Sequence, residues 1–182
     1  MIYSKTDRMI ETERLRLRLF KKSDAKEIAL MCNNYNVYKS TLSLPNPYTI
    51  ECALSWIESH EENFKENSKY EFAITDKVTG QLYGAIGISN QKQFKHGEMG
   101  YWIAEANWGN GYASEAAKAV IEFVFKEKDF HRVYARHFAS NPASGKVMKN
   151  CRMLYEGTMK DHIVKNGRFE DIVLYGIINS RK

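Results

Sequence analysis

Hydrophobic and polar residues alternate along several segments of the chain, a pattern that predicts half-buried strands. Two such segments flank the turn Lys77-Val78-Thr79-Gly80-Gln81 and predict an antiparallel hairpin. A second hairpin is expected around Lys165-Asn166-Gly167-Arg168, because Asn-Gly strongly favours a two-residue turn. The predicted strands are residues 12–20, 69–76, 82–89, 98–103, 131–138, 154–161 and 171–178.

Apolar residues at helical spacing predict two helices after the first strand. Ser23-Asp24 begins a short helix, and Thr49 is expected to cap a helix that runs to about residue 67. Residues 33–47, which lie between these helices, hold two of the three prolines. We therefore expect a loop or a broken helix there, of the kind that often shapes a site.

A continuous apolar stripe over residues 113–124 predicts a third helix, buried on one side. Since strands are predicted on both sides of it, residues 98–138 should form a strand-helix-strand unit with a parallel, right-handed crossover. A ligand would then lie at the carboxyl end of the first strand. Asn141 and Pro142 suit the start of a fourth helix that ends near Arg152.

The composition is that of an ordinary globular chain. With 182 residues, 43% of them hydrophobic, it suits one domain over residues 1–182 with a core at about residues 11–179. No stretch approaches the roughly 18 apolar residues of a membrane span, and charged residues stand where a signal peptide would be apolar. We expect a cytoplasmic protein that contacts no membrane.

Charge and cysteine usage exclude several classes of site. The five histidines show no metal-binding spacing, so no metal is expected. The formal net charge of +5 suits an anionic ligand or a ribosomal partner but also serves solubility. Arg14, Arg16 and Arg18 alternate with leucines on a predicted solvent-facing strand surface, and no nucleic-acid motif is present. Three widely spaced thiols are expected to be reduced and buried: Cys32, Cys52 and Cys151.

The turn Gly109-Asn110-Gly111 is the clearest functional signal in the sequence. It joins a strand end to the striped helix, and its glycines allow a tight turn that exposes successive backbone N–H groups. With the helix dipole, such groups can hold phosphate, although Gly-x-Gly turns also occur without a ligand. A Gly-Lys-Ser/Thr ending and a third glycine with a suitably spaced acidic residue are both absent, which excludes two common nucleotide loops.

The order of elements and several separate motifs resemble the GNAT superfamily of acyl-CoA N-acyltransferases, within it the RimJ/RimL group, over almost the whole chain. In most of the superfamily the glycine turn begins with Arg or Gln. Here Trp108 stands at that position, and tryptophan there is usual for the RimJ/RimL group. The matching motifs are Thr12-Glu13-Arg14-Leu15, Gly100-Tyr101-Trp102, Trp108-Gly109-Asn110-Gly111-Tyr112-Ala113-Ser114-Glu115-Ala116, His131-Arg132-Val133, Asn141-Pro142-Ala143-Ser144, Tyr155-Glu156-Gly157, and Asn166-Gly167-Arg168 followed by Asp171.

The resemblance implies an α+β fold: a twisted, mostly antiparallel sheet of about seven strands, with helices on both faces and a parallel pair that splays at the cofactor site. It implies acetyl-CoA as co-substrate and no metal. Backbone N–H groups of the glycine turn would hold the pyrophosphate, and an exposed strand edge would pair with the pantetheine arm. The expected cofactor-binding residues are Tyr101, Trp102, Ile103, Ala104, Gly109, Asn110, Gly111, Tyr112, Ala113, Ser114 and Asn141.

Two catalytic residues are proposed on the same basis. Ser144 matches the residue that protonates or hydrogen-bonds the coenzyme A sulfur in RimL-like enzymes. Glu98, on the strand that leads to the cofactor, could accept the amine proton directly or through water; its alternative role is a structural pair with a nearby arginine. Asn141 and Ser144 could also be an ordinary helix cap and first-turn serine. Other candidate bases are Asp161 and His162, and other candidate proton donors are Tyr101 and Tyr155.

The sequence departs from the group's pattern at two positions. Arg152 stands where a glycine commonly ends the helix in a left-handed conformation, which implies a different cap or some strain. Ile163 stands where a glutamate can act as base in the ribosomal-protein group. The identity of the general base is therefore open.

An acetyl-CoA-dependent N-acetyltransferase acting on a protein N-terminal α-amine, of the ribosomal-protein type, is the predicted function. An α-amine has a pKa near 7.7 to 8 and a lysine near 10.4, so neutralising lysine at pH 7 costs roughly 3.5 kcal/mol more. Small amines or polyamines as acceptors, and a non-catalytic acyl-CoA-binding or ribosome-associated module, are the alternatives. An exposed strand edge or the terminal hairpin could support a homodimer, but no sequence pattern fixes an oligomeric state.

Overall fold

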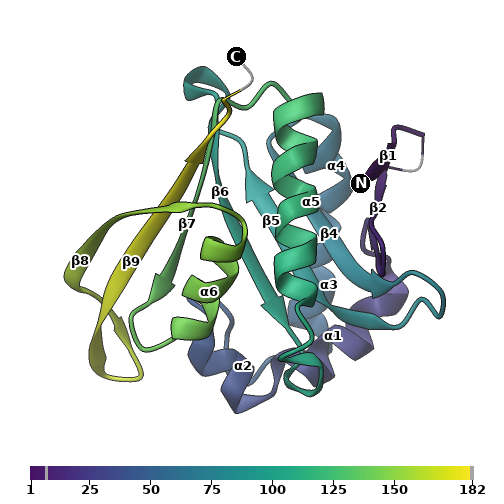
Figure 1. Cartoon of the computed structure of the whole chain (residues 1–182). Helices are drawn as coiled ribbons and strands as arrows, with labels where there is room; N and C mark the ends of the chain where they lie inside the picture. Colours follow the sequence, from purple (N-terminus) through teal and green to yellow (C-terminus); the bar gives the residue numbers. More distant parts are fainter. Residues whose placement is uncertain (7, 181–182) are drawn as a thin grey trace.

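The computed structural model describes residues 1–6 and 8–180, and its centre is a nine-stranded sheet in the order β1-β2-β3-β4-β5-β6-β7-β9-β8 (Figure 1). The strands are β1 (Ile2–Ser4), β2 (Met9–Glu11), β3 (Leu15–Arg18), β4 (Lys69–Asp76), β5 (Leu82–Ser89), β6 (His96–Ile103), β7 (Arg132–Phe138), β8 (Leu154–Lys165) and β9 (Arg168–Ile178). The helices are α1 (Ala25–Cys32), α2 (Tyr35–Ser40), α3 (Ile50–Glu58), α4 (His60–Lys65), α5 (Tyr112–Glu127) and α6 (Pro142–Asn150), with short 3-10 turns at Lys22–Asp24, Lys92–Phe94 and Glu105–Asn107.

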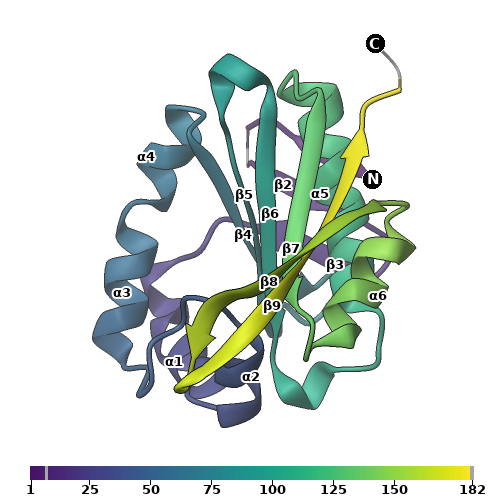
Figure 2. The ribbon, with the colours of Figure 1, turned by 90° about the vertical axis from the view of Figure 1, so that its left-hand side faces the viewer.

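Helices cover both faces of the sheet, so the molecule has three layers (Figure 2). The helices α5 and α6 lie on one face, and α1 and α3 lie on the other. The predicted apolar stripe of α5 is confirmed: Val120, Phe123 and Val124 are fully buried. Each such side chain contributes about 1.5–3 kcal/mol by leaving water, so this face of the helix fixes it on the sheet.

The two predicted hairpins are confirmed. Strands β4 and β5 have the expected bounds and pair antiparallel. Asn166 and Gly167 both take positive φ, 51° and 73°, as the favoured hairpin turn requires. The last two strands are longer than expected, because register shifts let the β8–β9 ladder continue past two irregular points.

Two predictions about the first third of the chain are corrected, and a third is confirmed. Strands β1 and β2 precede β3 and extend the sheet from about seven strands to nine; at three residues each, they are too short to show alternation. The helix predicted from Thr49 to about residue 67 is divided at Ser59 into α3 and α4. The segment 33–47, expected to be a loop or a broken helix, contains the short helix α2, whose N-cap Asn34 accepts hydrogen bonds from two backbone N–H groups.

The strand-helix-strand prediction is confirmed, and the parallel pair splays. Strands β6 and β7 pair only from His96 to Glu98, opposite Arg132 to Tyr134. Beyond these residues β6 continues along β5 and β7 continues along β9, so the two strands diverge (Figure 1). The gap between them leads toward the N-terminus of α5 and is flanked by α6.

The three cysteines are free thiols. Cys32 and Cys151 are buried as expected, whereas Cys52 is partly exposed, because it lies in the first turn of α3. Across residues 1–6 and 8–180, no helix has both the length and the apolar character that a membrane crossing requires. Within the same residues, no group of His, Cys, Asp and Glu side chains is placed to hold a metal ion.

Candidate functional site

Gly109 and Gly111 shape the turn before α5, which we call the cradle (residues 109–114). Both glycines have φ of +79°, a left-handed conformation that side chains disfavour. The first helical bond runs from Glu115 N to Gly111 O, so the N–H groups of residues 112–114 precede any helical acceptor and project from the helix end. A Cβ at Gly109 would meet nothing within 4 Å, so the conformation, not space, requires glycine there.

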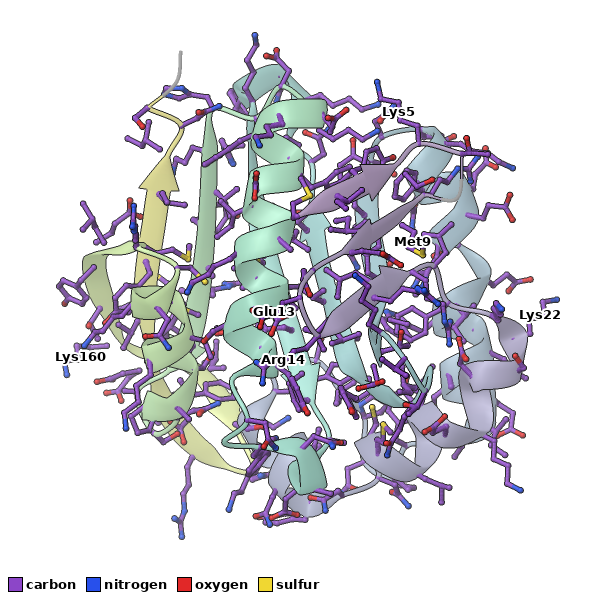
Figure 3. All side chains as sticks on the ribbon, turned by 45° about the vertical axis from the view of Figure 1, so that its right-hand side comes forward. Lys5, Met9, Glu13, Arg14, Lys22 and Lys160 are labelled. Carbon is purple, nitrogen blue, oxygen red and sulfur yellow. The ribbon has the colours of Figure 1, made fainter. Side chains whose placement is uncertain are left out.

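Arg14 braces the cradle from the turn between β2 and β3, a role that the sequence did not reveal. Its Nε donates to Glu115 Oε2 (2.7 Å) and its Nη1 donates to Asn110 O (3.0 Å). Thr12 Oγ1 donates to Glu115 Oε1 (2.6 Å). Figure 3 shows Arg14 directed toward the start of α5. Two of the motifs that carried the resemblance therefore meet in space.

Trp108 ties the cradle to the splayed strand. Its indole Nε1 donates to Ile103 O (2.7 Å), at the end of β6. Asn110 Nδ2 donates to Asn107 O and Trp108 O, which closes the turn on itself. The Tyr112 ring stacks on Tyr83 at 4.5 Å with an interplanar angle of 9°. The cradle is therefore fixed from both sides before any ligand arrives.

The edge of β6 that faces the gap presents backbone groups from alternate residues. Ala104 N donates to Tyr83 O (2.8 Å) on β5, so the even-numbered residues of β6 turn their polar backbone groups toward β5. Tyr101 and Ile103 turn theirs toward the gap. Because Trp108 already uses Ile103 O, Tyr101 offers the complete N–H and C=O pair at this edge.

A hydroxyl pair joins β6 to α6 across the gap. Tyr101 Oη lies 2.8 Å from Ser144 Oγ and donates to Ser144 O (3.0 Å). Burial raises the pKa of Tyr101 well above its usual value, so the phenol stays protonated at neutral pH. Ser144 lies in the first turn of α6, where Asn141 Oδ1 caps its N–H (3.3 Å) and Asn141 Nδ2 donates to Ser40 O. Asn141 thus caps α6, the alternative role that the sequence analysis gave it.

A cleft of about 620 Å³ opens beside this pair, on the face of the sheet that carries α1 and α3. Ala85, Gly87 and Gly100 line it from β5 and β6. Its apolar walls include Leu42, Leu44, Tyr48, Trp56, Trp102 and Phe138. This volume falls in the range of small-molecule and substrate sites.

Glu98 lines the cleft and is paired with Arg136, so the alternative role predicted for it, a structural pair with a nearby arginine, is present. Arg136 Nε donates to Glu98 Oε1 (2.6 Å), and Tyr134 Oη donates weakly to Oε2 (3.4 Å). Glu98 lies at the last paired position of β6 and β7, so its carboxylate stands at the apex of the gap. Its role as a base stays a prediction.

The cleft brings together only part of the predicted set. Glu98, Tyr101, Trp102 and Ser144 line it. Gly111 and Ser114 line a separate hollow of about 540 Å³ beside Arg14. The other residues that line this hollow come from α5 and from residues 1–2 and 11–14.

The other candidates lie elsewhere. Asp161 and His162 are exposed on the terminal hairpin, and Tyr155, also exposed there, pairs with Thr158. Ile163 lies on β8 opposite Glu170. Arg152 itself adopts the left-handed conformation (φ 62°), and Met153 N donates to Met148 O (3.1 Å) to close the helix end.

The fold and the site are those of an acyltransferase class: a parallel strand pair that splays, a glycine turn that opens the following helix, and a cleft beside the splayed strand. The model of the acetyltransferase (GNAT) domain family matches residues 14–154, so the chain belongs to this family. An uncharacterized N-acetyltransferase of Bacillus subtilis, YoaA, is 30% identical over 175 residues, which cover 96% of this chain and 98% of YoaA.

Solved structures show the same fold. A ribosomal-protein-S5-alanine acetyltransferase from Vibrio fischeri is 28% identical with a TM-score of 0.84, over 94% of this chain and 97% of that one. A RimL ribosomal L7/L12 alpha-N-protein acetyltransferase in complex with coenzyme A has a TM-score of 0.86 over 93% of this chain and 97% of that chain, at 21% identity. The predicted resemblance to the GNAT superfamily and its RimJ/RimL group, and the mixed fold, are confirmed.

Proposed function

We propose that this protein transfers the acetyl group of acetyl-CoA to a primary amine, and that the acceptor is the α-amine of a protein N-terminus. The observation that carries the proposal is the hydroxyl pair of Tyr101 and Ser144, which stands where the splayed edge of β6 meets the cleft. A proton donor at this place can serve a leaving group held along β6 and an acceptor held in the cleft. Without that contact, the cradle and the cleft would be two unrelated hollows.

The cofactor lies along the path from the cradle to the cleft. Backbone N–H groups of residues 109–114 hold the pyrophosphate, helped by the positive end of the α5 dipole. The pantetheine amides pair with the backbone of Tyr101 at the open edge of β6, as an added strand would. The thioester then reaches the side of the cleft that Ser144 lines.

Transfer needs a neutral amine, a polarised carbonyl and a proton for the thiolate. The amine nitrogen attacks the thioester carbon, the N–C bond forms, and the C–S bond breaks as the electron pair leaves on sulfur. Ser144 gives its hydroxyl proton to the sulfur, takes a proton from the Tyr101 phenol in return, and the phenol regains a proton from solvent before the next turnover. Glu98, at the apex of the gap, accepts the proton that the amine loses, directly or through water.

An α-amine is the acceptor that this site favours. It is partly neutral at pH 7, so it asks less of the base than a lysine, by roughly 3.5 kcal/mol. That difference matters because Glu98 is paired with Arg136. The S5-alanine acetyltransferase of Vibrio fischeri, which shares the fold and 28% of its residues, supports an N-terminal acceptor.

Release of free coenzyme A thiol tests the proposal. Purified protein is incubated with acetyl-CoA and a panel of N-terminally free peptides, lysine peptides with blocked N-termini, and small amines or polyamines. We expect release above the hydrolysis background with the free α-amine peptides first. Release with the small amines alone would move the acceptor class to small molecules.

Coenzyme A binding without turnover across the whole panel would favour a non-catalytic module instead. Calorimetry with coenzyme A distinguishes that outcome from an inactive preparation. Salt-sensitive binding to ribosomal RNA that is unaffected by Gly111→Asp in the cradle would point to a ribosome-docking role.

A further inference from the structure

A buried carboxylate lines the cleft outside the transfer machinery described above. Glu71, on β4, is 5% exposed. Its Oε2 lies 2.9 Å from Nε2 of the buried His60, and its Oε1 lies 2.8 Å from Lys69 Nζ. A carboxylate in such a place costs free energy to bury unless positive groups surround it. Because Glu71 is buried, its carboxylate does not serve solubility, and its place at the cleft suggests a role in binding.

Two glycines leave space for this side chain to extend over the sheet. Glu71 lies opposite Gly87 on β5, which in turn lies opposite Gly100 on the splayed strand β6. A Cβ on Gly87 would stand 3.0 Å from Glu71 Cγ, so glycine lets the side chain lie across β5. A Cβ on Gly100 would meet nothing within 4 Å, so the cleft is open there. The carboxylate thus borders the open part of the cleft, one strand from the proposed thioester position.

His60 holds Glu71 in this orientation. The imidazole is 2% exposed and packs edge-on against Trp56 at 4.5 Å and Phe20 at 5.5 Å. Since those rings fix the imidazole, the 2.9 Å contact with Glu71 is fixed as well. Burial acts to raise the pKa of Glu71, but the contacts with His60 and Lys69 outweigh it and hold the pKa below its usual value. The carboxylate is therefore charged at neutral pH.

The two basic partners of the cleft carboxylates differ in mobility. Arg136 binds Glu98 from the strand β7, with 32% of its side chain exposed. Lys69 reaches Glu71 on a flexible stem, and 43% of its side chain is exposed. Because the Lys69 ammonium is partly exposed, it can be hydrated when it leaves Glu71, and another ammonium can take its place. If Lys69 turns outward, Glu71 Oε1 loses its partner, and the carboxylate keeps only the contact of Oε2 with His60.

We propose that Glu71 binds the ammonium form of the acceptor amine, and that Lys69 occupies this subsite until an acceptor displaces it. The ligand class is a primary ammonium on an aliphatic or peptide stem, because the surrounding walls are apolar and aromatic. That the bound ammonium is the acetyl acceptor rests on the proposed function. Glu71 is a binding residue, and no proton transfer is assigned to it.

The two residues have opposite expected effects, which makes the test sharp. The probe is n-butylammonium chloride, with butan-1-ol as its neutral counterpart, titrated calorimetrically into the full chain loaded with coenzyme A. We expect Lys69→Met to bind n-butylammonium about three- to tenfold tighter than the unchanged protein, and Glu71→Gln to lose about tenfold or more. Butan-1-ol should bind all variants alike.

Lys65→Met is the matched control, because Lys65 pairs with Glu61 on α4 and does not line the cleft. It should leave n-butylammonium binding unchanged. Weaker binding in Lys69→Met, or equal binding in Glu71→Gln and the unchanged protein, would overturn the proposal. Lys69→Met tests the proposal even if Glu71→Gln fails to fold. If the Lys69–Glu71 ion pair were only structural, removing Lys69 could weaken n-butylammonium binding but could not strengthen it.

The outcome is separable from that of the proposed function. Ammonium binding with the expected pattern but no coenzyme A release would support the subsite and refute the transferase activity. With an active acceptor, Glu71→Gln should raise the acceptor KM about tenfold and leave the acetyl-CoA KM unchanged. Active transfer with an unchanged acceptor KM in both variants would refute the subsite alone.

Discussion

At the scale of single residues, the site depends on side chains whose partners come from distant parts of the chain. The Ser144 hydroxyl meets Tyr101, 43 positions earlier, and Glu98 meets Arg136. Sequence motifs singled out Ser144 and Tyr101 as separate candidates. That they form one pair follows from the splay of β6 and the position of α6, neither of which has a sequence signature.

Replacement of Ser144 by alanine should slow the chemical step. We expect kcat to fall about 10- to 100-fold, because the sulfur loses its proton donor, while the acetyl-CoA KM changes by less than about twofold. Steady-state thiol release measures both constants. Ser140→Ala, which removes a hydroxyl bonded to Glu170 outside the cleft, should have no effect on kcat. A proportionate loss of acetyl-CoA binding in Ser144→Ala would contradict the assigned role.

Arg152→Gly should stabilise the protein. Arg152 holds φ at 62°, which costs an L-residue about 1–2 kcal/mol, partly offset by the greater flexibility of glycine in the unfolded chain. A net gain of roughly 0.5–1 kcal/mol in the free energy of unfolding is expected by urea denaturation. Arg152→Ala keeps the strain and serves as control, with no gain. A loss of stability in the glycine variant would show that the guanidinium contributes more than the strain costs.

At the scale of elements, local sequence was sufficient where an element is held by its own turn or cap. The β4–β5 hairpin, the Asn-Gly turn and the Asn141 cap all lie where predicted. Prediction failed where an element is short and depends on a neighbour. The three-residue strands β1 and β2 exist because they pair in series with β3, and the helix after Thr49 breaks at Ser59, where α4 turns to follow β4.

The proposed function assigns cofactor binding to the backbone conformation of the cradle, so a methyl group there tests the assignment. Gly111→Ala places a Cβ at φ +79°, which strains the turn by about 1–2 kcal/mol. We expect the acetyl-CoA KM to rise about tenfold or more. Gly80→Ala is a matched control, since Gly80 has φ +77° in the β4–β5 turn, far along the chain from the cradle. It should lose similar stability and keep its KM; an equal KM change in both would exclude a specific cradle effect.

At the scale of the whole molecule, one ion-pair network links the segment between β2 and β3 to the N-terminal end of α5. Glu115 receives hydrogen bonds from Thr12, from the Arg14 backbone and from the Arg14 guanidinium. Partial burial acts to raise the pKa of Glu115, but these bonds outweigh it and lower the pKa below its usual value. The network therefore couples the stability of the molecule to pH.

Because the folded pKa of Glu115 is depressed, its contribution is complete above the unfolded pKa, near 4.3, and is lost as pH falls through the folded pKa. Glu115→Gln should destabilise the protein at pH 7 by about 1 kcal/mol. The difference from the unchanged protein should shrink when urea unfolding is repeated at pH 3. Glu27→Gln, an exposed position on α1, should show no deficit at pH 7. A deficit of the same size at both pH values would contradict a charge-based role.

The sequence by itself determined the kinds of elements, most of their bounds, the glycine turn and the family to which the chain belongs. These features depend on local backbone preference and on apolar periodicity, which are readable in short windows. Only the tertiary structure decided that Arg14 braces the cradle, that Tyr101 and Ser144 form one pair, and that Glu71 of β4 lies beside His60 of α4 at the cleft. Those contacts join residues of different elements, and their geometry is set by strand register and helix packing, which no local pattern encodes.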